Sequence, residues 1–147
     1  MNAPSRMIPD IDSANAPHWL GAREGKVVVQ VCDDCAKPRY PRTDLCPACA
    51  SAASTWKPMR PTGRVSSWCR FHRAYFPEFK DQMPYTVLLV RMDDGVDLFG
   101  NFAGDAIHDI PVIGQTVEAV FEEVAPGVSL VRFRAATGSA TLPGASV

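Results

Sequence analysis

Hydrophobic and polar residues alternate along most of the second half of this chain, a pattern that predicts β-strands rather than helices. Short turn sequences containing glycine, proline or aspartate separate the alternating or β-branched runs. Five such runs are expected as strands, over residues 63–72, 85–92, 97–104, 115–124 and 127–136. Five short strands at this spacing predict a small antiparallel barrel.

The strand expected over 63–72 has two faces of different character. Strict alternation places Cys69 on the same side as Val65 and Phe71, so that it points inward as a small buried hydrophobe. Trp68 and Arg70 would then lie on the outward face, a combination that is favoured at protein interfaces. The alternative is a solvated face with one stray aromatic side chain.

The first half of the chain has fewer strand signals. Residues 18–26 predict a short helix that ends at Gly25, because glycine is favoured just after a helix. The segment before it, 1–17, is polar with three prolines and is expected to be a flexible arm. Two further runs, 27–32 and 54–59, predict the outgoing and return strands of a small ribbon.

Four of the five cysteines gather between these two strands. They form the pattern CxxC, ten residues, CxxC, and are Cys32, Cys35, Cys46 and Cys49. Two such turns can surround one metal ion, and this spacing predicts a zinc site, with iron held by the same four thiolates as the alternative. A four-thiolate site has no open position for substrate, so the metal is expected to be structural.

The whole-chain composition limits the classes of function. The 147 residues carry a net charge of −1 and suit one compact domain that includes a metal-stabilised module. No apolar run is long enough for a membrane span, and the first 20 residues lack the pattern of a secretion signal. A cytoplasmic location is expected, where structural disulfides are rare. The expected divisions are an arm and helix over 1–26, a ribbon over 27–60, a barrel over 61–136 and a flexible tail over 137–147.

Several motifs together resemble one known family. The paired CxxC turns are followed in order by "MPYTVLLVRMDDG" and "LFGNFAG", and the likeness runs from about Trp19 to Phe133. The chain resembles the domain of unknown function 35 family, the zinc-ribbon OB-fold proteins associated with acyl-CoA enzymes of the thiolase type. The resemblance implies a mainly β fold: a short N-terminal helix, a rubredoxin-like four-cysteine zinc ribbon and a five-stranded OB-fold barrel.

The family places a glycine after each CxxC, but this chain has Ala36 and Ala50 there. Zinc knuckles often need a positive φ at that position, which carries modest strain in a residue other than glycine.

The resemblance also implies a function. Members of this family are partners of thiolase-type enzymes that act on acyl-CoA thioesters, and the catalytic cysteine and histidines lie on the partner. The chain would therefore be a non-catalytic accessory subunit that stabilises the complex and helps to form its CoA-thioester site. No catalytic residue is expected in this chain.

Candidate contacts with CoA or with the partner are aromatic or cationic residues near the first, second and last barrel strands. They are Trp68, Arg70, His72, Arg73, Tyr75, Phe76, Phe79, Arg132 and Arg134. Arginines suit CoA phosphates because they form charge-assisted hydrogen bonds, and the first and last strands are expected to lie close together. The alternatives are that the loop aromatics only cap the barrel and that His72 is a polar residue at a strand end.

Two other classes of function have weaker support in the sequence. OB-folds bind single-stranded nucleic acid through stacked aromatics in a basic groove, and Trp68, Phe71 and Tyr75 would supply the stacking. The near-neutral charge argues against this alternative. A stand-alone CoA-thioester enzyme is disfavoured because no nucleophile with a base is visible. Of the three histidines, His18, His72 and His108, none lies near a carboxylate in a recognisable base arrangement.

Overall fold

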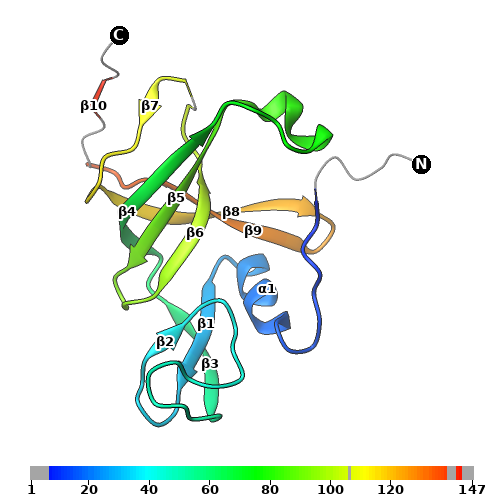
Figure 1. The fold of residues 1–147 in the computed structure, drawn as a ribbon, viewed down its shortest axis with the longest axis vertical. Coiled ribbons are helices and arrows are strands. Elements are labelled where there is room, and N and C mark those ends of the chain that lie inside the picture. The colour runs from blue at the N-terminus through cyan, green and yellow to red at the C-terminus, as the bar shows by residue number, and fades with distance from the viewer. Residues whose placement is uncertain (1–6, 106, 139–141, 144–147) are drawn as a thin grey trace.

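The computed structural model describes residues 7–105, 107–138, 142 and 143. Five of its strands close into a barrel in the order β4-β5-β6-β9-β8 (Figure 1). Their bounds are β4 Thr62–Phe71, β5 Tyr85–Met92, β6 Asp97–Phe102, β8 Thr116–Ala125 and β9 Val128–Ala135. The predicted five-stranded barrel and mainly β fold are confirmed. All barrel pairs are antiparallel except β6 with β9.

A smaller three-stranded sheet forms the ribbon. The strand β1 Val27–Cys32 lies between β2 Pro38–Arg39 and β3 Ser54–Met59, and both pairs are antiparallel. In Figure 1 this ribbon is at the bottom and the barrel lies above it.

A short α-helix lies between the arm and the ribbon. The helix α1 Ala16–Arg23 contacts both β1 of the ribbon and β9 of the barrel (Figure 1). It begins two residues earlier than predicted and ends at Arg23, with Glu24 as the C-cap and Gly25 just after it at a φ of +74°. The N–H of Lys26 donates to the carbonyl of Gly21 at 2.8 Å, and the N–H of Gly25 donates to that of Ala22 at 3.1 Å. These two bonds form a Schellman motif, which glycine favours because it has no Cβ.

The ribbon and the barrel share one hydrophobic core. Val27 and Val29 of β1 are at most 1% exposed and belong to the same cluster as Leu88, Val90 and Phe133 of the barrel. Burial of apolar area is the main favourable term in folding, so loss of the ribbon would also expose part of the barrel core.

The remaining elements are short. The 3₁₀ helix η1 Pro77–Gln82 lies in the connection between β4 and β5, and β7 Asp109–Ile110 pairs with β10 Leu142–Pro143. Of the predicted flexible tail, residues 139–141 and 144–147 lie outside the described residues, as do residues 1–6 of the predicted arm. Within the described part of the chain, no helix is long and apolar enough to cross a membrane.

A β-bulge in β4 overturns the predicted faces of that strand. Val65 pairs with Val90, but the next pair is Ser67 with Leu89, so Ser66 is an extra residue without its own partner. One extra residue moves every later side chain to the opposite face. Cys69 is therefore exposed, not buried, and Trp68 packs against the core from the inner side.

The expected proximity of the first and last barrel strands is also wrong. The strand β8 pairs with both β4 and β9 and so separates them. The arginines of β4 and β9 consequently belong to different parts of the barrel wall.

Candidate metal centre and contact surfaces

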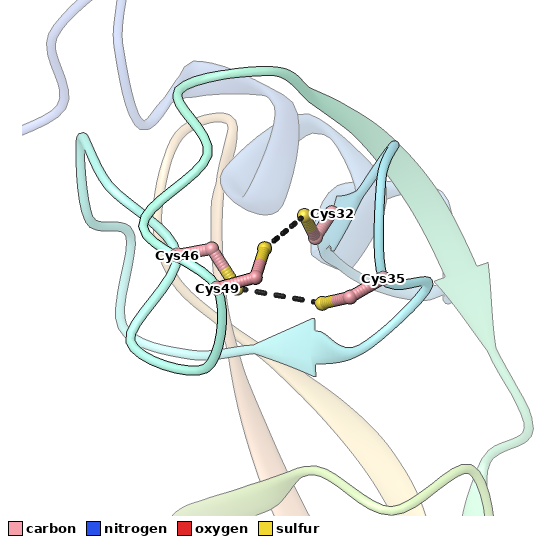
Figure 2. A group of neighbouring side chains, drawn as sticks. All are labelled: Cys32, Cys35, Cys46 and Cys49. Atoms are coloured by element: carbon pink, nitrogen blue, oxygen red, sulfur yellow. Dashed lines mark hydrogen bonds between the residues drawn. The ribbon is translucent and has the colours of Figure 1, made fainter.

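The four clustered cysteines converge at the end of the ribbon. Figure 2 shows their sulfurs pointing toward one another from two separate turns. The Sγ atoms of Cys32 and Cys49 are 3.6 Å apart, as are those of Cys35 and Cys46, and all four lie within 4.8 Å of one another. Four sulfurs placed tetrahedrally about 2.3 Å from one ion would be roughly 3.8 Å apart. The donor set and its spacing therefore fit a four-thiolate metal centre.

Backbone N–H groups in each turn point at the sulfurs and favour thiolates. The N–H groups of Ala48 and Cys49 lower the pKa of Cys46 to about 6. The pKa of Cys32 is lowered chiefly by the N–H of Cys35. For Cys49 the N–H of Ser51 acts in the same direction, but the neighbouring sulfurs and burial together raise its pKa to about 12. A bound cation would stabilise all four thiolates, since metal binding releases the remaining protons.

The two turns have the strained backbone that the sequence predicts. Ala36 has a φ of +59° and Ala50 a φ of +61°, and both are in the left-handed region. The N–H of Ala36 donates to the carbonyl of Cys32 at 3.0 Å, and that of Ala50 to Cys46 at 2.8 Å. The expectation of a positive φ at both non-glycine positions is confirmed.

The outer face of β4, β5 and β6 carries an apolar surface that sequence analysis missed. The bulge turns Cys69 and Phe71 outward, and their partners Val87 and Tyr85 on β5 share this face. Further along β5, Leu89 pairs with Phe99 of β6, which is 72% exposed. We call this surface, together with the loop aromatics described next, the outer strip.

The aromatic loop between β4 and β5 extends the same surface. Phe71 and Tyr85 stack with ring centroids 4.9 Å apart, and Phe79 packs on Tyr85 at 5.6 Å. Beyond them, Tyr75 is 70% exposed and Phe76 is 50% exposed. The outer strip therefore consists of residues from β4, β5 and β6 and of three loop aromatics. The strand residues are Cys69, Phe71, Tyr85, Val87, Leu89 and Phe99, and the loop residues are Tyr75, Phe76 and Phe79.

Three other candidate contact residues, Arg70, His72 and Arg73, are not part of the outer strip. Arg70 donates from Nε to the hydroxyl of buried Thr86 at 3.1 Å and from Nη2 to the carbonyl of Asp109 at 2.8 Å, so it holds the segment containing β7 against the barrel. His72 and Arg73 are exposed next to the loop, and the guanidinium of Arg73 lies 6.0 Å from the ring centroid of Tyr75.

The arginines of β9 already have carboxylate partners. Arg132 pairs with Glu122 at 2.8 Å, and Arg134 pairs with Glu118 at 2.6 Å. A CoA phosphate would have to compete with these partners, so the two arginines are weaker candidates for CoA than the sequence suggests.

Two histidines have specific partners, and one of them corrects the sequence analysis. His108 Nδ1 lies 2.8 Å from Asp105 Oδ2, which raises the pKa of His108 and lowers that of Asp105 to about 2. The sequence analysis, which found no histidine near a carboxylate in a base arrangement, missed this exposed pair. His18 is 5% exposed, and its Nδ1 lies 2.8 Å from the carbonyl of Val28. Burial lowers the pKa of His18, and the Val28 carbonyl partly opposes that effect.

Two small hollows flank Trp19, between the helix, the ribbon and the barrel. One measures about 270 Å³ and reaches Trp56, and the other measures about 170 Å³ and reaches Phe99. Both are below the range of roughly 300–1,000 Å³ that is usual for small-molecule pockets. Neither hollow would enclose a CoA thioester without help from a second protein.

A four-cysteine ribbon joined to a closed five-stranded barrel defines the class of zinc-ribbon OB-fold proteins. Two family descriptions match adjacent parts of the chain: the ChsH2 rubredoxin-like zinc ribbon domain matches residues 19–54, and the ChsH2 C-terminal OB-fold domain matches residues 56–122. The chain belongs to this family of ChsH2 and DUF35 zinc-ribbon OB-fold proteins. The predicted family and the predicted OB-fold are confirmed.

The chain is similar to a chain of an aldolase, to a probable enoyl-CoA hydratase subunit and to a further DUF35-family protein. A solved chain of the Ltp2–ChsH2(DUF35) aldolase is 33% identical with a TM-score of 0.75, over 86% of this chain and 98% of that one. A probable enoyl-CoA hydratase alpha subunit from Thermomonospora curvata is 34% identical over 131 residues, which are 89% of this chain and 40% of that protein. A DUF35-family structure from Sulfolobus solfataricus, 14% identical with a TM-score of 0.57 over 84% of this chain and 86% of that one, shares the fold.

Proposed function

We propose that this chain is a non-catalytic accessory subunit of an acyl-CoA-processing complex, with a thiolase-like enzyme as its partner. The observation that carries the proposal is the outer strip, an apolar face on one side of the barrel on which Phe99, Tyr75 and Phe76 are exposed among the described residues. Exposed apolar patches of this kind mark interaction sites. The similarity to a probable enoyl-CoA hydratase alpha subunit supports an acyl-CoA enzyme as the partner, and the similarity to a chain of the Ltp2–ChsH2(DUF35) aldolase supports a role in an enzyme complex.

We infer further that the metal is zinc and that its role is structural. Four thiolates complete a tetrahedral shell, so no position remains for water or substrate. The metal would hold the two turns together in a module too small to fold on hydrophobic burial alone. A reducing cytoplasm would keep the four thiols available for the metal.

The outer strip favours a protein over a nucleic acid as the partner. Strands and loops in this position bind oligonucleotides in many OB-folds, and exposed aromatics could stack on bases. Phosphate binding also needs clustered cations. The connection from 72 to 84 instead balances Arg73 and Lys80 against Glu78 and Asp81. On the neighbouring strands, Arg91 is already paired with Asp97 at 2.8 Å.

The first experiment is recovery of the native complex. The chain would be captured from extract of its own cells at moderate salt, followed by mass spectrometry of co-purifying proteins and a metal assay. We expect a thiolase-like chain at fixed stoichiometry and one zinc per copy of this protein. Recovery of nucleic acid that washes off with salt, without such an enzyme, would instead support the single-strand-binding alternative.

A pair of matched variants tests the outer strip. Phe99→Asn should weaken the recovered complex by roughly 30-fold or more, because central aromatic residues carry much of the binding free energy at interfaces. Ile113→Asn is the control, since Ile113 is also 60% exposed but is not part of the outer strip. Affinity would be measured by titration of the purified partner, with circular dichroism to verify folding.

The two variants also separate the docking surface from the accessory function itself. Equal affinity of Phe99→Asn and wild-type protein would show that the partner binds elsewhere on the chain. The accessory function would still hold in that case, because the complex itself would remain.

A further inference from the structure

The ribbon encloses a cation that has no charged partner among the described residues. Arg39 is only 6% exposed. Its Nε donates to Gln30 Oε1 at 3.1 Å, and its Nη2 donates to the carbonyl of Thr43 at 3.3 Å. Both of these acceptors are neutral. The third nitrogen, Nη1, is buried and has no hydrogen-bond partner in the described part of the protein.

Such an arrangement is unfavourable unless negative charge lies nearby. Removing a charged group from water carries a large desolvation cost, and neutral hydrogen bonds only partly offset it. Arginine cannot avoid the cost by losing its proton, because the guanidinium stays protonated in proteins. We therefore expect negative charge near Arg39. The carboxylates in the ion pairs of the described residues are paired with other cations, so this charge should come from another group.

Strand register places Arg39 on the same face of the ribbon as the metal centre. Arg39 pairs with Gln30 across β2 and β1, and Gln30 and Cys32 are two residues apart on β1, so their side chains point the same way. Ser54 pairs with Cys32 across β1 and β3, and its hydroxyl lies 3.4 Å from Gln30 Nε2. The guanidinium, the carboxamide and the first metal-binding sulfur thus follow one another along one face.

We propose that Arg39 balances part of the negative charge of the four-thiolate metal centre. Four thiolates around a divalent ion carry a net charge of −2, and they lie on the same face of the ribbon as this buried cation. Arg39 does not bind the metal, so it is a positioning residue that acts through charge and through Gln30. The inference rests on the proposed divalent metal and is independent of the proposed partner.

Gln30 also connects Arg39 to the loop that precedes the second CxxC turn. Its Oε1 accepts from Arg39 Nε and also from the N–H of Thr43 at 3.0 Å. Thr43 lies three residues before Cys46, in the loop that leads to the second CxxC turn. The same carboxamide thus links the cation to both halves of the metal centre.

The first test measures zinc affinity in the full chain by competition with a chelator. Arg39→Met removes the charge but keeps a long side chain, whereas Arg39→Lys keeps the charge. We expect Arg39→Met to lower zinc affinity by about 10- to 100-fold, the usual range for residues that support metal ligands, and Arg39→Lys to stay near wild type. If Arg39→Met does not fold, the neutral and polar Arg39→Gln takes its place.

The second test separates charge from packing. With iron in place of zinc, the four-thiolate centre has a net charge of −1 when ferric and −2 when ferrous. A nearby cation favours the ferrous form, so Arg39→Met should lower the reduction potential, by about 59 mV for each tenfold change in that preference. Arg39→Lys should restore it.

Three results would overturn the proposal. The first is zinc affinity in Arg39→Met that equals wild type. The second is reduced affinity with an unchanged iron potential, which would show that Arg39 acts through packing alone. The third is a wild-type chain that binds no metal, since the buried cation would then have no anion to balance.

Discussion

The two alanines at positive φ show how far a single residue can be understood from sequence. The comparison with a family pattern predicted the left-handed backbone at Ala36 and Ala50, and the structure has it at both. In both turns the N–H of the alanine donates to the carbonyl of the first cysteine, so the two CxxC turns share one local geometry. An isolated alanine in the left-handed region costs roughly 1–2 kcal/mol relative to the right-handed region.

Replacement of either alanine by glycine should therefore stabilise the metal-bound protein. We expect Ala36→Gly and Ala50→Gly each to raise the free energy of unfolding by up to about 1 kcal/mol, since glycine relieves the strain but loses more chain entropy on folding. Chemical denaturation in the presence of excess zinc measures the change. Ala48→Gly is the control, because Ala48 in the same turn has no positive φ, and that variant should be neutral or less stable.

His18 makes a second prediction at the residue scale. Burial lowers its pKa below the ordinary 6.5, so the folded protein resists a proton that the unfolded chain accepts. The contribution of neutral His18 to the free energy of unfolding is fully present above pH 6.5. It falls as the pH drops below 6.5, by at most about 1.4 kcal/mol per pH unit. The measurement is the free energy of unfolding from pH 7.5 to 5.5 for wild type and His18→Asn.

Asparagine is a suitable replacement because its side-chain N–H can still donate to the Val28 carbonyl that His18 Nδ1 contacts. Any loss of metal at low pH affects both proteins and cancels in the difference. The stability advantage of wild type over His18→Asn should shrink as the pH falls. A difference that stays constant across this range would rule out a depressed pKa.

At the scale of elements, the strands were predictable but one face was not. Period-two patterning located all five barrel strands, and it placed Cys69 and Trp68 on the wrong sides because it assumes an unbroken alternation. The bulge at Ser66 depends on the pairing of β4 with β5 and on the backbone hydrogen bonds between Val65 and the residues just before β8, Gly114 and Gln115. These are long-range interactions that a local sequence pattern does not contain. The arginine pairs on β9 were missed for the same reason.

The shared core predicts that ribbon and barrel unfold together. Removal of the metal with a chelator should lower the melting temperature of the barrel itself by about 10 °C or more, because Val27 and Val29 leave its core. Each kcal/mol lost moves the midpoint by roughly 2–4 °C in a chain of this size. Trp68 fluorescence reports the barrel once Trp19→Phe and Trp56→Phe have removed the other tryptophans.

A chelator that abolishes the ribbon but leaves the Trp68 transition unchanged would contradict this coupling. Ribbon and barrel would then be independent domains despite their common cluster. Excess zinc added back should restore the original midpoint, which controls for irreversible damage to the thiols.

At the scale of the whole molecule, the convergence of the four cysteines could be predicted from the sequence, whereas only the loop aromatics of the proposed docking surface could. Cysteine spacing is a local signal, and four residues in two turns define the site. The outer strip combines residues from three strands and a loop, and only the register of those strands brings Leu89 beside Phe99. Alternation in "DLFGNF" does place Phe99 opposite the buried Leu98 and Phe102, so this one residue was within reach of sequence reasoning.

The bulge in β4 has an evolutionary consequence. Because Ser66 is the extra residue, its deletion would join Val65 to Ser67 in regular alternation and would keep the pairs from Ser67 with Leu89 to Phe71 with Tyr85. Trp68 would stay inside the barrel and Cys69 on the surface. Deletion of a residue between Ser67 and Phe71 would instead exchange the inner and outer sides of part of the strand. The gene should therefore tolerate loss of the Ser66 codon better than loss of any codon from 67 to 71.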